Sequence, residues 1–543
     1  VENLSDNDIW KLNRGGHDPV KVYAAFKRAT ETKGRPTVIL AKTVKGYGMG
    51  SAAEGMNIAH QVKKVDVNHL KAFRDRFDLP ISDEAVESYS YYKPDENSPE
   101  VKYLKEKRAA LGGFVPQRLE KFTNKLEIPA LSDFESILAG SGDREISTTM
   151  AFVRVLNVLL KDKNIGKNIV PIVPDEARTF GMEGMFRQFG IYSSAGQKYI
   201  PQDKDQVAFY KEDIKGQVLQ EGINELGAMS SWMAAATSYS VNDYPMIPFY
   251  IFYSMFGFQR TGDLCWAAGD QKARGFLVGG TSGRTTLNGE GLQHEDGHSH
   301  ILANTVPNCI TYDPTYGYEV AVIVKDGVER MYGEKQEDVF YYITTLNQNY
   351  VQPAMPEGAE EGIIKGIYKV KTFEAKNDFK VKLLGSGSIF QEAIRAAEIL
   401  SSEYDIKIDI YSVTSYNELT REAQDIEREN LLNLDKEAKI PYIEKVLGSN
   451  NDNIVISATD YMKSYSEQLR PYVKGSFKAL GTDGFGRSDS RANLRKFFEV
   501  DTNFIVYTTL AELARNGKLD KKVALEAMKK YEIDSNRINP RNA

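Results

Sequence analysis

The chain has 543 residues, of which 41% are hydrophobic and 27% are charged, and its formal net charge at pH 7 is −6. This composition supports several packed cores and excludes a disordered chain, and the slightly acidic balance provides no basic field for a nucleic acid. The longest uncharged apolar stretch, residues 246–258, is shorter than the roughly 20 residues that a membrane helix needs, so we expect a cytoplasmic protein with no membrane partner.

The first segment, residues 1–125, is predicted to be the end of an α/β domain. A helix should begin at Asp18-Pro19, because aspartate caps helix N-termini and proline is tolerated in the first turn. The apolar run Thr37–Ala41 predicts a short buried strand. Since the chain enters these elements almost at once, we expect the domain to begin upstream of Val1.

The second segment, residues 126–352, is predicted to form an α/β domain. A helix with one apolar face should follow Ser147, and short apolar runs then alternate with helical stretches, among them 169–173, 246–253, 276–279, 309–312 and 339–344. Strands separated by helices indicate a mostly parallel sheet that is covered on both faces. Cys265 and Cys309 lie in apolar surroundings, so we expect buried free thiols in a reducing compartment.

The third segment, residues 353–543, begins after a link rich in Pro, Glu and Gly and is predicted to be a further α/β domain. A strand, the turn Gly385-Ser386-Gly387, a helix and the strand Ile406–Val413 follow one another. The turn could hold a phosphate at the start of the helix, or it could be a plain structural turn. The predicted fold class is therefore α/β, with three consecutive domains.

Residues 289–300 contain three of the six histidines, His294, His298 and His300. Histidines at this spacing could hold a metal ion. However, the glycines among them make a continuous helix improbable, so the three side chains would not share one face. A polar, histidine-rich loop at a strand end is better interpreted as the wall of an active site, and we assign no metal ligand.

Carboxylates mark two further strand ends or helix starts. Asp175 and Glu176 follow the strand that ends at Val173, and they are either functional or a helix cap that pairs with Arg178. Glu225 stands among small and apolar residues at the start of an Ala-rich helix. It is either an acid stabilised by the helix dipole or a catalytic carboxylate.

The segment from Gly46 to His60 contains four glycines, at positions 46, 48, 50 and 55, with small residues between them. This composition is typical of a gate that orders over a bound intermediate and excludes water, or of a flexible surface loop. A second polar loop, residues 193–206, could pair with it.

Four stretches carry a family resemblance. Gln220–Leu226 and Phe252–Arg260 resemble the pyrimidine-binding region of transketolase-like thiamine diphosphate enzymes. Residues 175–182 and 279–300 are similar to the homodimeric bacterial pyruvate dehydrogenase decarboxylating components in particular, and the resemblance runs from end to end. It implies that residues 1–125 are the C-terminal part of a diphosphate-binding domain, 126–352 a pyrimidine-binding domain and 353–543 a C-terminal α/β domain.

The resemblance also implies chemistry. Glu225 would hydrogen-bond the pyrimidine ring nitrogen of thiamine diphosphate, and Phe256 with Tyr253 would line the slot for the ring. The positions that match the family's catalytic and substrate-facing residues are Lys45, His60, Glu176, Glu225, Glu290 and His294. The positions that match its cofactor-binding residues are Asp175, Glu225, Tyr253 and Phe256.

The implied activity is the oxidative decarboxylation of pyruvate with reductive acetylation of the lipoyl group of dihydrolipoamide acetyltransferase, by a homodimer in the pyruvate dehydrogenase complex. The Gly-Asp-Gly motif and the distant Asn with which the family holds the diphosphate and Mg²⁺ are absent from this chain, so we expect these ligands upstream of Val1. The alternatives are another transketolase-like enzyme or a non-catalytic dimerisation fragment. An active site shared between two subunits leaves open whether residues 1–543 act alone.

Overall fold

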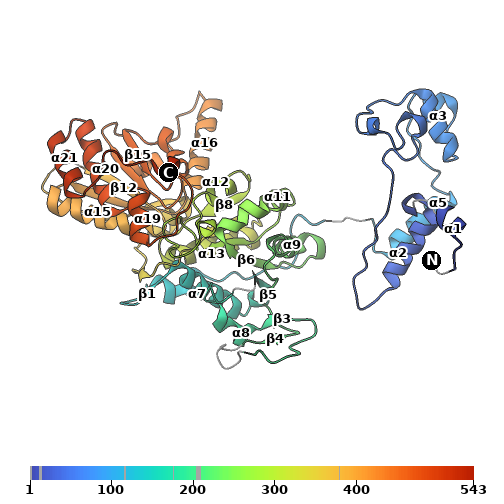
Figure 1. The fold of residues 1–543 in the computed structure, drawn as a ribbon, viewed down its shortest axis with the longest axis horizontal. Helices are drawn as coiled ribbons and strands as arrows, with labels where there is room; N and C mark the ends of the chain where they lie inside the picture. The colour runs from blue at the N-terminus through green and yellow to red at the C-terminus, as the bar shows by residue number, and fades with distance from the viewer. Residues whose placement is uncertain (1–2, 12–14, 115–117, 175–176, 203–209, 378–379) are drawn as a thin grey trace. The chain divides into compact units, whose positions relative to one another are not determined.

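The computed structural model describes residues 3–11, 15–114, 118–174, 177–202, 210–377 and 380–543. The chain divides into two compact units, Val1–Val115 and Pro116–Ala543 (Figure 1).

The first unit is helical. Its α-helices are α1 (Asp6–Lys11), α2 (Pro19–Glu31), α3 (Val67–Arg76), α4 (Asp83–Glu87) and α5 (Pro99–Ala110). The helix predicted at Asp18-Pro19 is confirmed, since the Asp18 carboxylate accepts hydrogen bonds of 3.0 Å from the amides of Val20 and Lys21.

The strand predicted at Thr37–Ala41 is wrong. These residues have no regular secondary structure, and the side chains of Val38 and Leu40 are 81% and 92% exposed. A strand forms only where a neighbouring strand pairs with its backbone, and the described part of residues 3–114 contains no strand.

The second unit is built around a six-stranded parallel sheet with the strand order β5-β2-β6-β7-β9-β8. These strands are β2 (Ile169–Val173), β5 (Leu219–Gln220), β6 (Ile247–Tyr253), β7 (Phe276–Gly280), β8 (Cys309–Tyr312) and β9 (Phe340–Thr344). The sheet confirms the parallel arrangement that the alternating apolar runs predict.

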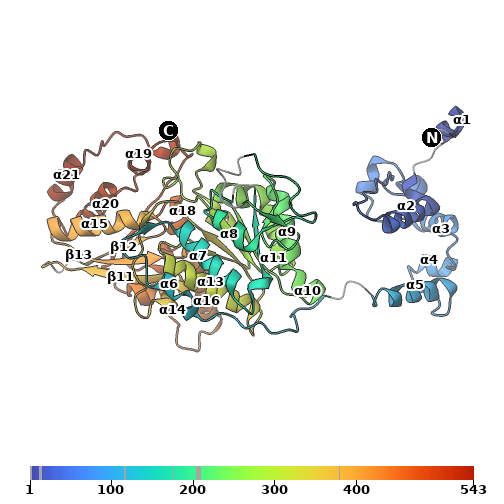
Figure 2. The ribbon, with the colours of Figure 1, turned by 90° about the horizontal axis from the view of Figure 1, so that it is seen from below.

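Helices cover both faces of this sheet, as the alternation of side chains along β6 shows. Phe249 and Ile251 belong to the core beneath α7 (Thr148–Lys161) and α13 (Gly317–Tyr332), which pack side by side (Figure 2). Tyr250 and Phe252 point to the opposite core, beneath α9 (Glu225–Ala236) and α11 (Gly257–Asp270). Because both faces of the strand are buried, its sequence is a continuous apolar run.

A second, five-stranded sheet has the order β11-β13-β12-β14-β15, and only β11 is antiparallel to its neighbour. Its strands are β11 (Ile367–Phe373), β12 (Lys380–Gly385), β13 (Lys407–Val413), β14 (Ile454–Ala458) and β15 (Ser476–Leu480). The helix α15 (Ile389–Tyr404) packs on β12 and β13 and against α20 (Thr502–Arg515). This arrangement confirms the strand, turn, helix and strand predicted for the third segment.

Two short pairings complete the second unit: β1 (Glu145–Ile146) with β10 (Tyr350–Val351), and β3 (Ile191–Tyr192) with β4 (Glu212–Asp213). Cys265 and Cys309 are buried free thiols, as predicted. Within the described residues, no helix combines the length and apolarity needed to cross a membrane.

Candidate functional site

A pocket of about 280 Å³ lies at the carboxyl ends of β2, β5 and β6. Parallel strands bring these ends to one edge of the sheet, where ligands of α/β proteins commonly bind. The residues that line the pocket are Pro174, Gly222, Ile223, Asn224, Glu225, Tyr250, Phe252, Tyr253, Phe256, Arg260, Gln293 and His294.

Glu225 is the carboxylate of this pocket. It is the first residue of α9, and the side chain of the preceding Asn224 caps the helix by accepting a hydrogen bond of 3.0 Å from the amide of Gly227. The Glu225 side chain is only 19% exposed. The cap therefore fixes where α9 begins, and the start of the helix holds a largely buried carboxylate against the pocket.

Aromatic rings form the wall beside this carboxylate. Tyr253 is the last residue of β6, and Phe256 ends the short 3-10 turn Ser254–Phe256 that follows. The Phe256 ring centroid lies 5.9 Å from that of Tyr253 and 5.1 Å from that of His294. The strand end, the turn and the later loop thus place three rings around one space.

Arg260 joins the carboxylate to the aromatic wall. Its Nη1 donates to Glu225 Oε1 at 2.6 Å, and its guanidinium carbon lies 3.9 Å from the centroid of the Phe256 ring. Sequence reasoning gave this arginine no role, although it stands four residues after Phe256 at the start of α11, where a helix brings side chains together. The partner in the ion pair comes from another helix, which spacing alone does not reveal.

His294 enters the pocket from the loop after β7. Its Nδ1 atom is buried, and no described residue forms a hydrogen bond with it. Glu290 Oε2 lies 3.9 Å from this nitrogen, beyond hydrogen-bond distance. A buried ring nitrogen without a partner is available to a ligand, whereas the Glu290 side chain is half exposed and does not line the pocket.

The loop that carries His294 is anchored on residues 482–487. Glu295 is fully buried, and its Oε2 accepts a hydrogen bond of 2.6 Å from the amide of Arg487. Burial raises the pKa of Glu295 to about 7. Arg284 donates to the carbonyl oxygens of Thr482 and Gly484 at 2.5 and 2.6 Å. The position of His294 therefore depends on contacts with a segment almost 200 residues away in the sequence.

Two of the other predicted residues, Lys45 and His60, belong to the first unit. Lys45 Nζ donates to His60 Nδ1 at 2.8 Å within the first unit. Asp175 and Glu176 are outside the described residues, although Pro174 immediately before them lines the pocket.

The histidine-rich loop does not gather its three imidazoles. His300 is fully buried among the rings of Tyr342 and Tyr465, and burial lowers its pKa to about 3, so it stays neutral at physiological pH. His298 Nε2 contacts Gln259 Oε1 at 2.9 Å. Across the described ranges, no group of three or more His, Cys, Asp or Glu side chains could hold a metal ion.

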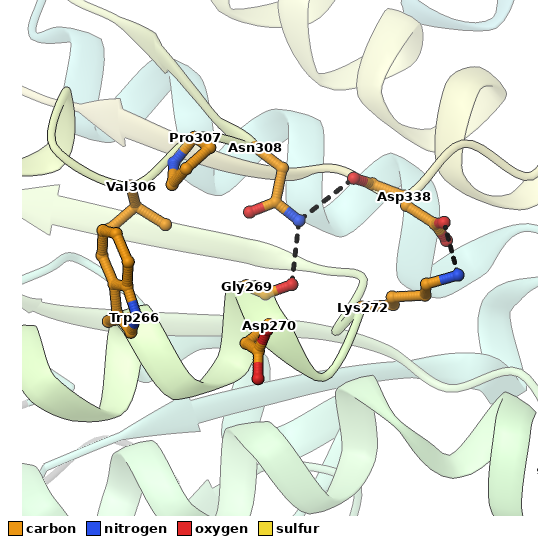
Figure 3. Close-up of a pocket in the computed structure, with 8 residues that line it drawn as sticks. All are labelled: Trp266, Gly269, Asp270, Lys272, Val306, Pro307, Asn308 and Asp338. Carbon is orange, nitrogen blue, oxygen red and sulfur yellow. Dashed lines mark hydrogen bonds and ion pairs between the residues drawn. The ribbon is translucent and has the colours of Figure 1, made fainter.

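A second pocket, of about 330 Å³, lies at the opposite edge of the sheet, where β7, β8 and β9 begin (Figure 3). Three of its polar residues, Asn308, Lys272 and Asp338, form contacts within the pocket lining. Asn308 Nδ2 donates to the carbonyl oxygens of Gly269 and Asp338 at 3.0 and 3.2 Å, and Lys272 Nζ lies 3.3 Å from the Asp338 carboxylate. The pocket at the carboxyl ends of β2, β5 and β6 contains the Glu225 carboxylate and the buried Nδ1 of His294. It is therefore the better candidate for a functional site.

The pocket lies in a part of the chain that matches a known family model. Residues 126–353 match the model of the pyruvate dehydrogenase E1 component middle domain, and residues 366–501 match that of the transketolase-like C-terminal domain. The pyruvate dehydrogenase E1 component of Escherichia coli (strain K12) is 62% identical over 100% of this chain and 61% of its own length. That of Pseudomonas aeruginosa is 61% identical over 99% of this chain and 61% of its own length. The chain thus spans about three-fifths of these relatives.

Solved structures show the fold. The transketolase of Campylobacter jejuni has a TM-score of 0.61 at 17% identity, with 91% of this chain and 66% of that chain covered. The transketolase of Leishmania mexicana has a TM-score of 0.59 at 17% identity, with 95% and 69% covered. The chain therefore has the predicted transketolase-like α/β fold.

Proposed function

Because the chain belongs to the pyruvate dehydrogenase E1 component family, we propose that the protein decarboxylates pyruvate oxidatively with thiamine diphosphate and acetylates the lipoyl group of dihydrolipoamide acetyltransferase. The observation that carries the proposal is the pocket in which Glu225, Phe256 and His294 meet at the carboxyl edge of the six-stranded sheet.

The pocket suits the pyrimidine half of thiamine diphosphate. Phe256 and Tyr253 offer aromatic surface on which a flat heterocycle can stack, and Glu225 offers one carboxylate beside that surface. When it is bound, thiamine diphosphate supplies a nucleophilic ring carbon and the electron sink that decarboxylation needs.

The chain's own residues have distinct tasks in this proposal. The Glu225 carboxylate holds and exchanges a proton with the pyrimidine ring nitrogen, since a largely buried acid at the pocket wall can hydrogen-bond that atom. Phe256 and Tyr253 orient the ring. His294 presents its unpaired Nδ1 for proton transfer to or from the substrate.

The other predicted site residues extend this proposal to the substrate. Lys45 and His60, which form a hydrogen-bonded pair, would act on pyruvate together with Glu176 and Glu290, and Asp175 would help to bind the cofactor. The family resemblance supports these roles. Residues 46–60 would form a gate over the site.

Among the described residues, no group of three or more His, Cys, Asp or Glu side chains could hold the Mg²⁺ ion. Mg²⁺ therefore belongs to the proposal for the full-length protein, as do the homodimer, the cytoplasmic location and the lipoyl-bearing partner. The domain boundaries at 125/126 and 352/353 also remain proposals. The six-stranded sheet lies between residues 169 and 344, and the five-stranded sheet lies between residues 367 and 480. Because the two sheets occupy separate parts of the chain, they support the second boundary.

The test uses the full-length protein with thiamine diphosphate and Mg²⁺. We expect release of carbon dioxide from pyruvate and acetylation of a lipoyl domain, with no transfer of a ketol group to an aldose. Ketol transfer without pyruvate decarboxylation would point to a transketolase and contradict the proposal. Binding of the cofactor without either reaction would contradict it as well.

A further inference from the structure

Arg260 makes the two contacts that a bound pyrimidine ring would need. Its guanidinium carbon lies over the Phe256 ring, 3.9 Å from the ring centroid. Its Nη1 also donates a hydrogen bond of 2.6 Å to Glu225 Oε1. A flat, nitrogen-bearing cation thus contacts the same aromatic ring and the same carboxylate as a flat, nitrogen-bearing heterocycle would.

The free faces of Phe256 are restricted by its other neighbours. The His294 and Tyr253 rings are inclined to this ring by 58° and 69°, whereas the Arg260 guanidinium lies over it. Arg260 and Phe256 both line the pocket, and the Arg260 side chain is 48% exposed. The arginine therefore has room to leave toward solvent, whereas the rings are fixed by the strand end and the loop.

The ion pair also opposes the task proposed for Glu225. The guanidinium nitrogen contacts Glu225 Oε1 at 2.6 Å, and the same group lies over Phe256, the ring on which the pyrimidine would stack beside this carboxylate. Proton exchange between Glu225 and the ring therefore requires that the arginine release the carboxylate.

We propose that Arg260 is a placeholder for the pyrimidine ring: it holds Glu225 and Phe256 in position in the ligand-free protein and is displaced when the cofactor enters. This inference rests on the proposed function, and it makes Arg260 a positioning residue that sets the cofactor affinity. In the absence of ligand, Arg260 keeps the largely buried Glu225 carboxylate paired. Because the cofactor must displace Arg260, it binds less tightly than it would without this arginine.

The test is a calorimetric titration of the full-length Arg260→Met variant with thiamine diphosphate in the presence of Mg²⁺. A half-exposed ion pair and a cation–π contact together contribute little, so we expect the dissociation constant to fall roughly 3- to 30-fold relative to the parent protein. Arg154→Met is the matched control, because Arg154 is exposed on α7 and loses the same charge. It should leave the constant unchanged.

Two further measurements separate displacement from other effects of the charge. The uncharged probe 4-amino-2-methylpyrimidine should gain affinity by the same factor, since it carries no diphosphate that a lost cation would affect. In a Glu225→Gln background, removal of Arg260 should change the affinity less than roughly 3-fold, because the ion pair is already gone.

If the parent protein binds thiamine diphosphate but Arg260→Met binds both probes no more tightly than the parent does, the placeholder role alone would be overturned. Failure of the parent protein to bind thiamine diphosphate would overturn the proposed function and the placeholder role together.

Discussion

Substitution of Glu225 by glutamine tests the proposed proton exchange, because the amide keeps the size of the side chain and cannot carry the proton. Two stabilising effects are lost: a negative charge at the first turn of α9 and the ion pair with half-exposed Arg260. Together they contribute about 1 kcal/mol to the free energy of unfolding, so the variant should fold. Loss of a general acid–base group costs roughly 100- to 10,000-fold in rate, about 3 to 5 kcal/mol in the activation free energy.

The assay is pyruvate decarboxylation by the full-length variant at saturating cofactor, with urea denaturation on the same samples. Glu135→Gln is the matched control, since Glu135 is an exposed first-turn residue of α6 (Glu135–Leu138) outside the pocket. It should keep full turnover. Turnover above roughly a tenth of the parent value in Glu225→Gln would refute the role of Glu225, as would a loss of rate explained by unfolding.

Three other substitutions probe the structure around the site. Phe256→Ala removes the stacking surface and should weaken cofactor binding roughly 10-fold in a titration; equal affinity would place the ring elsewhere. Burial raises the pKa of Glu295 from 4.5 to about 7, so the folded protein holds this proton more tightly than the unfolded chain. The free energy of unfolding should therefore fall as the pH rises through this window. In Glu295→Gln this fall should be smaller by about 1 to 3 kcal/mol. A variant whose pH profile equals that of the parent protein would show that Glu295 ionises normally. Trp232→Ala deletes a fully buried side chain whose Nε1 donates to the Phe276 carbonyl oxygen at 3.0 Å, and it should cost about 3 to 5 kcal/mol in urea denaturation; a cost below about 1 kcal/mol would contradict the packing of α9.

The parts of the fold that local patterns encode were predictable. The continuous apolar runs of the six-stranded sheet follow from burial on both faces, and Asp18 marks a helix start through a contact with its own next residues. The run Thr37–Ala41 has the same composition but no neighbour to pair with in the described chain, and composition cannot supply a pairing partner.

The candidate site was predictable in part for the same reason. Glu225 and Phe256 stand at recognisable strand and helix ends, and resemblance indicated their roles. The contact between Arg260 and Glu225, and the anchoring of the His294 loop through Glu295, join residues that are far apart in the sequence. Such contacts depend on how the elements pack, which spacing along one segment does not determine.

The most direct test of the central claim is a crystal structure of the full-length protein with thiamine diphosphate bound. We expect the pyrimidine ring over Phe256, with a ring nitrogen about 2.6 to 3.2 Å from a Glu225 carboxylate oxygen. A cofactor whose pyrimidine ring lies outside this pocket, or whose nitrogen contacts another group, would contradict it.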